Sequence, residues 1–293
     1  MEPEIYFNIV SHIRKSRGLT RTCMKQLVKL FPEQSYDTLF SILSLEYQKR
    51  MKCNHMKTQM NKNKYWELYL EGVKNMDSPG IIVRIAERLD VAPCLVAKLI
   101  LSQYFENNES SGLSDQVTLN VNSYLRDTTL IPDMNLASEI FLVGTFVLTG
   151  TDSLISNLYI NSVGQQYEVK LCREVTKLGL GFRDEEHLRK HGYDKTPDCK
   201  LEVPVMIDGL VVNWIESKAL FGDEDVHKDY MKNQYLSYWN RFGPGLVIYW
   251  FGYVQTIVEP NDKRFTIRDH VPQNMIHISL PNFEMDDTPG TGT

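Results

Sequence analysis

The sequence lacks a long apolar run. A membrane-spanning helix needs roughly 18 or more consecutive apolar residues, and the longest candidate, residues 245–258, is interrupted by Gly252 and Gln255. The opening residues, MEPEIYF, lack the basic and then apolar layout of a secretory signal. With 42% hydrophobic and 24% charged residues, the composition is that of a globular protein. We therefore expect neither a membrane anchor nor secretion.

Paired cysteines are also missing. The five cysteines are scattered, and none forms a CxxC motif, so neither a disulfide framework nor a structural zinc site is expected. Cys53 and His55 are the nearest metal-like pair, and no second pair accompanies them. Reduced thiols are typical of the nucleus and cytoplasm, where we expect this protein to act.

Two common catalytic patterns are absent as well. No glycine-rich phosphate loop is present, since Gly243-Pro244-Gly245 is typical of a turn. No Ser/His/Asp or Cys/His order points to a nucleophilic hydrolase. His187, His191 and His227 are accordingly expected to be structural or solvated.

Basic residues are outnumbered overall but concentrated at the start of the chain. The sequence holds 32 lysines and arginines against 37 aspartates and glutamates, a formal net charge of −5. Residues 1–66 nevertheless hold 12 basic and 5 acidic residues, a net charge of +7, which suggests contact with a polyanion. Residues 49–64, expected as a helix end and a loop, are either solvated or contact phosphates. The candidate nucleic-acid contacts there are Lys49, Arg50, Lys52, Lys57, Lys62 and Lys64.

Residues 1–130 are expected to form an all-helical region. Apolar residues recur at helical spacing, and Ser35 is placed to cap a helix. Ser78-Pro79-Gly80 is typical of a helix start, and helices over residues 81–89 and 94–105 would be joined by a short turn. This is the layout of a DNA-binding helix-turn-helix, although a simple packed helix pair accounts for it equally well.

Residues 131–281 have a mixed pattern that indicates an α/β domain, followed by a flexible tail over residues 282–293. Asp208-Gly209 between two apolar runs is a strong hairpin signal. The expected helices cover residues 133–147, 153–178 and 225–241, and the expected strands cover residues 200–207, 210–219, 246–258, 265–267 and 276–280.

The second strand of the hairpin brings charged groups into an apolar setting. Alternation along residues 210–219 places Trp214, Glu216 and Lys218 on one face. Both faces are otherwise largely apolar, as in a sheet covered on both sides, so the charges indicate a function. The alternative is an ordinary surface ion pair, which contributes little to stability.

Asp198, at the start of the first strand, is the second candidate carboxylate. A strict two-residue turn would point it away from Glu216 and Lys218. One extra residue on the first strand sets Asp198 opposite Lys218, and Pro204 is the natural place, because proline within a strand occurs at bulges or edges. We therefore predict a bulge or irregularity between Asp198 and Ile207.

Two carboxylates and a lysine at a strand opening suit a hard divalent cation. Mg²⁺ prefers oxygen ligands and keeps several waters while it binds one or two carboxylates, and Mn²⁺ is a possible substitute. Such an ion polarises a phosphoryl oxygen and activates water. A lysine can orient that water and oppose the charge on the scissile phosphate.

The short motifs are weak alone, because Pro132-Asp133 and Glu168-Val169-Lys170 repeat them elsewhere in the chain. Order and hairpin context single out Pro197-Asp198 and Glu216-Ser217-Lys218. Glu168 itself is expected on a helix upstream, and a helical Gln234–Tyr238 segment follows downstream with its two end residues one turn apart.

This order of motifs, over about residues 150–260, resembles that of the PD-(D/E)xK nuclease superfamily. Longer strings are similar to those of the codanin-interacting nucleases: GYDKTPDC from Gly192, WIESKALFGDE from Trp214 and SYWNRFGPGLVIYWF from Ser237. The resemblance implies a restriction-endonuclease-like α/β fold, in which helices flank a mixed sheet. It also implies two partners, nucleic acid and a codanin-like protein.

Carried over residue by residue, the resemblance implies a complete active site. Its metal ligands would be Asp198, Glu216, the backbone carbonyl of Ser217 and Glu168, the last directly or through water. Its catalytic groups would be Lys218, Asp198, Glu216 and Gln234, of which Gln234 would orient the substrate or the lysine. Tyr238 is expected to pack rather than to react.

Two functions of different classes follow. The first is a metal-dependent nuclease that hydrolyses phosphodiester bonds, of DNA rather than RNA, with a metal-activated water and a codanin-like partner. The second is a non-catalytic scaffold with a nuclease fold that binds DNA and protein. The intact set of Asp198, Glu216 and Lys218 favours the enzyme, because a scaffold has no use for it.

Overall fold

The computed structural model describes residues 1–16, 20–108, 121–147 and 154–277. The chain falls into two compact units that no single cut in the sequence separates. The helical unit comprises Met1–Gln166, Ala219–Gly222 and Phe251–Thr256. The sheet unit comprises Tyr167–Lys218, Asp223–Trp250 and Ile257–Thr293. The domain boundaries expected at residues 130 and 281 stay predictions, and the expected tail over residues 282–293 lies outside the described residues.

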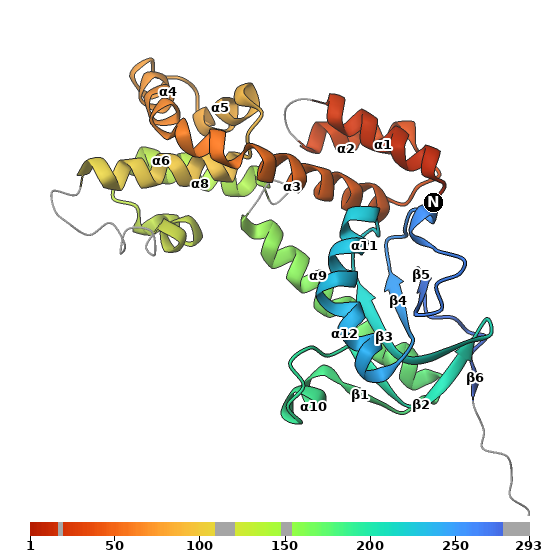
Figure 1. Cartoon of the computed structure of the whole chain (residues 1–293). Helices are drawn as coiled ribbons and strands as arrows, with labels where there is room; N and C mark the ends of the chain where they lie inside the picture. Colours follow the sequence, from red (N-terminus) through yellow and green to blue (C-terminus); the bar gives the residue numbers. More distant parts are fainter. Residues whose placement is uncertain (17–19, 109–120, 148–153, 278–293) are drawn as a thin grey trace, which may run out of the picture. The chain divides into compact units, whose positions relative to one another are not determined.

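The helical unit contains the succession of helices drawn from red to yellow-green in Figure 1. Its elements are α1 (Pro3–Lys15), α2 (Thr20–Leu30), α3 (Tyr36–Met60), α4 (Lys62–Lys74), α5 (Ile81–Leu89), α6 (Pro93–Asn108), η1 (Thr128–Leu130) and α8 (Met134–Val147). Ser35 caps α3 as predicted, because its Oγ accepts the backbone N–H of Thr38 at 3.1 Å.

The basic stretch from Lys49 to Lys64 is helical, so the expected helix end and loop were wrong. It forms the second half of α3 and the start of α4, and only Asn61 interrupts the two helices. Long unbranched side chains such as lysine, arginine, glutamine and methionine lose little rotamer freedom in a helix. The sequence also has no glycine or proline between Pro32 and Gly72 to stop it.

Helices α5 and α6 form the expected helix pair, but Ser78 does not cap α5. The chain enters α5 at Gly80, whose φ of 96° favours glycine. The buried carboxylate of Glu139 in α8 takes the place of a cap: it accepts the backbone N–H of Gly80 at 2.7 Å and that of Ile82 at 3.2 Å. A DNA-binding role for this pair stays a prediction.

Two short segments that follow strands of the sheet belong to the helical unit. In Ala219–Gly222, the backbone N–H of Phe221 donates to Oγ of Ser41 at 2.8 Å, and the Phe221 ring stacks on Tyr6 at 5.6 Å. In Phe251–Thr256, the carbonyl of Phe251 accepts the hydroxyl of Thr38 at 2.8 Å. Phe221 is fully buried by this arrangement.

The sheet unit carries the strands. Helix α9 (Leu154–Lys177) leads into it from the helical unit. The later elements are β1 (Phe182–Asp184), α10 (Glu185–Lys190), β2 (Cys199–Ile207), β3 (Leu210–Lys218), α11 (Glu224–Tyr230), the π-helical turn η2 (Met231–Tyr235), α12 (Leu236–Phe242), β4 (Gly245–Tyr249), η3 (Gln255–Ile257), β5 (Phe265–Arg268) and β6 (Ile276–His277). Residues of η3 before Ile257 are counted with the helical unit.

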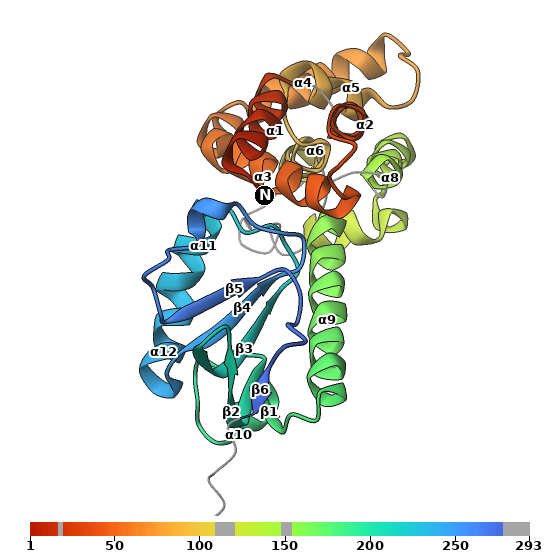
Figure 2. The same cartoon turned by 90° about the vertical axis from the view of Figure 1, so that its right-hand side faces the viewer.

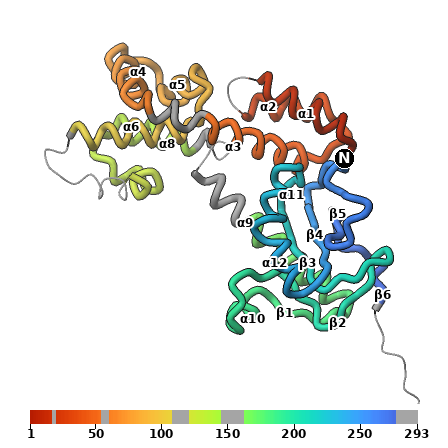
Figure 3. Tube along the Cα trace, viewed as in Figure 1, coloured from red at the N-terminus to blue at the C-terminus, as the bar shows by residue number. Residues whose placement is uncertain are grey.

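The strands form one mixed sheet in the order β1-β2-β3-β4-β5, and β6 also pairs with β2, beside which it lies in Figure 3. The pairs β1–β2, β2–β3 and β2–β6 are antiparallel, whereas β3–β4 and β4–β5 are parallel. The hairpin turn lies at Asp208-Gly209 as predicted, with φ values of 49° and 80° that suit an Asp-Gly turn. The fold is therefore α/β, as expected.

Helices cover both faces of the sheet (Figure 2). On one face, Leu171 and Val175 of α9 join the apolar core formed by the central strands. On the other, Tyr238 of α12 packs edge-on against Trp214 of β3, with ring centroids 5.2 Å apart. Trp214 lies directly over Gly245, where a Cβ atom would fall 2.1 Å from the indole ring. Only glycine fits at this first position of β4.

Strand β4 is shorter than expected. It ends at Tyr249, whereas the sequence predicted a strand over residues 246–258. The chain turns at Trp250 and Phe251, and Gly252 follows with a φ of 87° that breaks the extended backbone. The apolar residues beyond the turn therefore pack from a loop.

All five cysteines are free thiols, as predicted. Cys172 and Cys199 lie closest, with sulfur atoms 3.9 Å apart. In the part of the chain that the structure describes, no helix is both long enough and apolar enough to cross a membrane.

Candidate active site

An irregularity in β2 sets the position of Asp198. Near the turn, Val205 pairs with Val212, but further along Cys199 pairs with Ile215. Six positions along β2 thus match three along β3, and the register shifts between Lys200 and Val205. The predicted irregularity is confirmed, but it adds three residues instead of one. Side chains alternate between the two faces of a strand, so a shift of three residues has the same effect on orientation as a shift of one. Asp198 therefore still turns toward the charged face of β3.

The larger shift brings Asp198 to Glu216, and not to Lys218 as expected. The backbone N–H of Asp198 donates to Oε2 of Glu216 at 3.3 Å. In return, Oδ2 of Asp198 accepts the backbone N–H of Ser217 at 2.7 Å. The two carboxylates are therefore fixed to each other's backbone where β2 and β3 meet.

Lys218 completes the group. Its Nζ lies 2.6 Å from Oε1 of Glu216, and the two side chains are only 13% and 4% exposed. The same ammonium lies over the ring of Tyr230 in α11, 4.5 Å from the centroid, which is a cation–π distance. Asp198, Glu216 and Lys218, the candidate catalytic residues, are hereafter called the triplet.

Burial and mutual repulsion perturb the carboxyl groups. Burial raises the pKa of Glu216, and the ion pair with Lys218 only partly offsets it. Burial, and then the charge of Glu216, raise the pKa of Asp198 well above its usual range. Burial alone would lower the pKa of Lys218, but the charge of Glu216 and its hydrogen bond, then Asp198, outweigh it and raise that pKa. Such perturbation is typical of functional sites.

The backbone of the triplet is also held from Trp250, the residue that follows β4. Trp250 donates its indole N–H to Oγ of Ser217 at 2.8 Å and its backbone N–H to the carbonyl of Lys218 at 3.0 Å. These bonds fix the Ser217–Lys218 peptide at the end of β3. The metal-ligating role expected of the Ser217 carbonyl stays a prediction.

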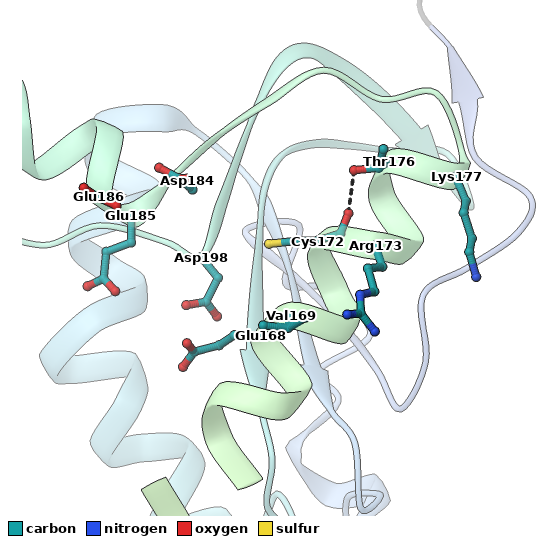
Figure 4. Close-up of a pocket in the computed structure, with 10 residues that line it drawn as sticks. All are labelled: Glu168, Val169, Cys172, Arg173, Thr176, Lys177, Asp184, Glu185, Glu186 and Asp198. Atoms are coloured by element: carbon teal, nitrogen blue, oxygen red, sulfur yellow. Dashed lines mark hydrogen bonds between the residues drawn. The ribbon is translucent and has the colours of Figure 1, made fainter. Parts of the chain in front are cut away.

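Glu168 faces Asp198 across a pocket of about 760 Å³ (Figure 4). Its charge contributes to the raised pKa of Asp198. The acidic pocket, as we call it, is lined by Glu168, Val169, Cys172, Arg173, Thr176, Lys177, Asp184, Glu185, Glu186 and Asp198. Among the described residues, no three His, Cys, Asp or Glu side chains are placed to hold a metal ion together.

Gln234 lies in the π-helical turn η2, which interrupts the otherwise expected helix over residues 225–241. Its Oε1 is buried and has no hydrogen-bond partner. Buried polar atoms are nearly always paired, and π-helical turns occur often at functional sites. Tyr238 is buried against Trp214, as expected of a packing residue.

The three histidines occupy the structural or solvated settings expected of them. His227 is buried, and its Nδ1 lies 2.9 Å from the hydroxyl of Tyr249, which in turn contacts the hydroxyl of Tyr235 at 3.2 Å. Burial lowers the pKa of His227. His187 and His191 are exposed and stack on each other with ring centroids 4.3 Å apart.

The six basic residues proposed as nucleic-acid contacts lie in α3 and α4, in different settings. Lys49, Arg50 and Lys62 each form an ion pair with a carboxylate. Lys52 and Lys64 are exposed, whereas the side chain of Lys57 lies outside the described residues. A nucleic-acid role for all six stays a prediction.

Sequence reasoning missed two side chains that act on the triplet. Tyr230 is remote from Lys218 in the sequence, and no spacing rule links a strand lysine to a ring on a later helix. Glu185 begins α10, and its charge adds to the raised pKa of Glu216.

Comparisons with known proteins identify relatives of the chain. A family model described as "Protein of unknown function TPD sequence-motif" matches residues 132–271. CDAN1-interacting nuclease 1 of Xenopus laevis is 39% identical over 270 residues, which cover 92% of this chain and 88% of the relative. The Homo sapiens and Bos taurus proteins of the same name are 38% and 40% identical over 261 residues, which cover 88% of this chain and 91% of each relative. No solved structure matches the chain. The chain belongs to the CDAN1-interacting nuclease 1 family.

Proposed function

We propose that the chain is a divalent-metal-dependent nuclease of the PD-(D/E)xK type that hydrolyses phosphodiester bonds in DNA. The observation that carries this proposal is the triplet, in which the carboxylates of Asp198 and buried Glu216 meet the largely buried ammonium of Lys218 at the ends of β2 and β3 away from the hairpin turn. The printed names of the relatives, which call them nucleases, support it. The mixed sheet with helices on both faces supports the fold assignment.

The donor set suits Mg²⁺ or Mn²⁺. Asp198 and Glu216 offer hard carboxylate oxygens, and burial raises the pKa of both carboxyl groups, a cost of charging them that a bound cation would offset. Mg²⁺ commonly takes one or two carboxylates and fills its other positions with water and phosphate, so two ligating side chains suffice. The Ser217 carbonyl would join them, and Glu168 would act through water across the acidic pocket. When bound, the ion would supply positive charge for the phosphate and a water of lowered pKa.

Lys218 supplies the second positive charge. Its ammonium is held between Glu216 and the Tyr230 ring, so it loses little further freedom when a phosphate arrives. From there it would donate hydrogen bonds to the phosphate oxygens as negative charge builds on them. Gln234, whose buried amide oxygen lacks a partner, would orient the attacking water or the substrate.

A codanin-like protein is the proposed partner, because the relatives are named for an interaction with CDAN1. We propose the nucleus and cytoplasm as its location. Capture of a codanin-like protein on the purified full chain tests the partner. Failure of the two to associate when both are pure and folded would remove this part of the proposal without touching the chemistry.

Cleavage assays with the full chain test the central proposal. Labelled DNA and RNA are incubated with Mg²⁺ or Mn²⁺, and DNA is expected to be cut. Asp198→Asn and Lys218→Ala should abolish cleavage. The second Pro-Asp pair provides a matched control: Asp133 caps α8 through Oδ1, at 2.8 Å from the N–H of Asn135, and Asp133→Asn keeps that cap and should keep full activity.

Two outcomes would overturn the proposal. If cleavage survives both triplet substitutions, the activity comes from another site or a contaminant. If no substrate is cut under any metal condition, the fold serves as a scaffold that binds DNA and protein, and the triplet is a structural ion cluster.

A further inference from the structure

A second pocket in the sheet unit has a lining of opposite charge to the acidic pocket. It has a volume of about 830 Å³, within the usual range of roughly 300–1,000 Å³ for ligand sites. The basic pocket, as we call it, is lined by Arg183, His187, Leu188, His191, Tyr193, Lys200, Asn213, Arg241 and Phe242. No aspartate or glutamate is among these residues, so the lining presents only positive and neutral side chains.

The cations of this pocket are only partly neutralised. Arg183 pairs with Glu202 at 2.7 Å, and Arg241 pairs with Asp194 at 2.5 Å. Within the described residues, the side chain of Lys200 forms no ion pair or hydrogen bond, although its charge helps to lower the pKa of Glu202. A lysine that forms no ion pair, in one pocket with two arginines, is the composition of a site for an anion.

Aromatic rings border these cations. Tyr193 is 38% exposed, and its ring lies 5.5 Å from that of Phe242 at a tilted angle. The guanidinium of Arg241 lies over the Tyr193 ring at 6.0 Å. Cations interleaved with an exposed ring characterise surfaces that bind single nucleic-acid strands, where phosphates meet the charges and a base stacks on the ring.

Two elements connect the basic pocket with the acidic one. Helix α10 places Glu185 and Glu186 in the acidic pocket and His187 and Leu188 in the basic one. The chain at the start of β2 does the same, because Asp198 lines the acidic pocket and Lys200, two residues later, lines the basic pocket. Two strand residues span roughly 6.5 Å, comparable to the spacing of neighbouring phosphates along an extended nucleic-acid strand.

We propose that the basic pocket binds a phosphate of the nucleic-acid strand next to the scissile phosphodiester. Lys200 is its central ligand, Arg241 and Arg183 flank it, and Tyr193 stacks on the adjoining base. This inference rests on the proposed nuclease function, which supplies the scissile phosphate at the triplet. The anion is either an internal backbone phosphate or the terminal phosphate of a strand.

Binding measured without cleavage tests the pocket separately from the chemistry. A fluorescently labelled single-stranded DNA is titrated with the full chain in EDTA, and fluorescence anisotropy reports the dissociation constant at several salt concentrations. Lys200→Gln should weaken binding about tenfold and lower the slope of log K against log salt by about 0.7, the value for one lost phosphate contact on a single strand. Lys200→Arg should restore most of both.

Lys263→Gln is the matched control, because Lys263 is exposed and lines neither pocket. It should leave affinity and salt slope close to those of the parent chain. Circular dichroism and the melting temperature show whether each variant is folded, and Lys200→Glu adds a charge reversal that should weaken binding further. Unchanged affinity and slope for folded Lys200→Gln and Lys200→Glu would overturn the proposal.

Two DNA probes separate the possible anions. One strand carries a 5′-phosphate and the other a 5′-hydroxyl. If the phosphorylated strand binds more tightly and Lys200→Gln removes that advantage, the pocket holds the terminal phosphate. If both strands lose affinity equally, it holds a backbone phosphate. If the chain binds DNA in this way but never cuts it, the proposed nuclease function is refuted and the proposed phosphate site stands. If the chain cuts DNA but Lys200→Gln leaves binding unchanged, the nuclease function stands and the phosphate site is refuted.

Discussion

The backbone N–H of Asp198 donates a hydrogen bond to Oε2 of Glu216 at 3.3 Å, which fixes the position of the Glu216 carboxylate. In the same way, Oδ2 of Asp198 accepts a hydrogen bond from the backbone N–H of Ser217, which fixes the Asp198 carboxylate. This reciprocity orients both carboxylates before any ligand arrives. Preorganisation of this kind removes reorganisation from the catalysed step, and the predictions below follow from it.

Substitution Lys218→Met is expected to separate catalysis from metal binding. Methionine keeps an apolar stem against the Tyr230 ring but removes the charge. The rate of DNA cleavage should fall about 10²–10³-fold or more, the scale of losing one preorganised electrostatic contact in a transition state. Metal affinity, followed by titration calorimetry, should stay equal or rise, because a competing cation beside Glu216 is gone. A loss of only a few-fold in cleavage would contradict the assigned role.

Asp198→Asn should stabilise the metal-free protein at neutral pH. The folded chain raises the pKa of Asp198, so folding favours the protonated form, and stability falls as pH rises from the ordinary carboxyl pKa toward the raised one. Asparagine removes this cost, and should therefore raise the melting temperature of the metal-free protein at neutral pH.

Melting curves in EDTA between acid and neutral pH would measure that difference. The gap between variant and parent should close below the ordinary carboxyl pKa, where the side chain is protonated in both the folded and the unfolded state. Added Mg²⁺ should stabilise the parent and leave Asp198→Asn unchanged. A gap that is constant with pH would show that titration of Asp198 is not its source.

Gln234→Leu should reduce activity without reducing stability. The amide oxygen of Gln234 is buried and unpartnered, so an apolar side chain of similar size removes a desolvation cost of about 1–3 kcal/mol. The melting temperature should hold or rise, while DNA cleavage should fall about tenfold or more. A variant that melts earlier and cuts normally would assign Gln234 to the fold instead.

Gly245→Ala should destabilise the protein by about 1–3 kcal/mol or more. Its Cβ would fall 2.1 Å from the Trp214 ring, which α12 and the strands enclose. Gly164→Ala in α9 is the contrasting substitution, because nothing lies within 4 Å of the added carbon, and it should stabilise by about 0.5–1 kcal/mol through helix propensity. Denaturant titration of both variants measures these effects; equal stability of the two would contradict the packing at Trp214.

The parts of the fold that the sequence predicted well depend on local signals. Asp208-Gly209 determines a hairpin by its own backbone preferences, and Ser35 caps a helix through a neighbour three residues away. Strand alternation likewise placed Glu216 and Lys218 together. In each case the chemistry that decides the structure lies within a few residues.

The parts that could not be predicted depend on contacts distant in sequence. The size of the irregularity in β2 follows from pairing with β1, β3 and β6 together, and nothing near Pro204 specifies three residues instead of one. Glu139 caps α5 from α8, and Tyr230 reaches Lys218 from α11. Each depends on packing that no short window of sequence contains.

Phe221 shows why the sheet unit could not be expressed without the helical unit. The polypeptide crosses five times between the helical and sheet units, and Phe221, three residues after Lys218, shares its environment with Ser41 and Tyr6. Removing the first helices would expose this ring and leave its amide unpaired. The sheet unit is thus not a detachable module: truncation or proteolytic excision would damage the chain just beyond Lys218.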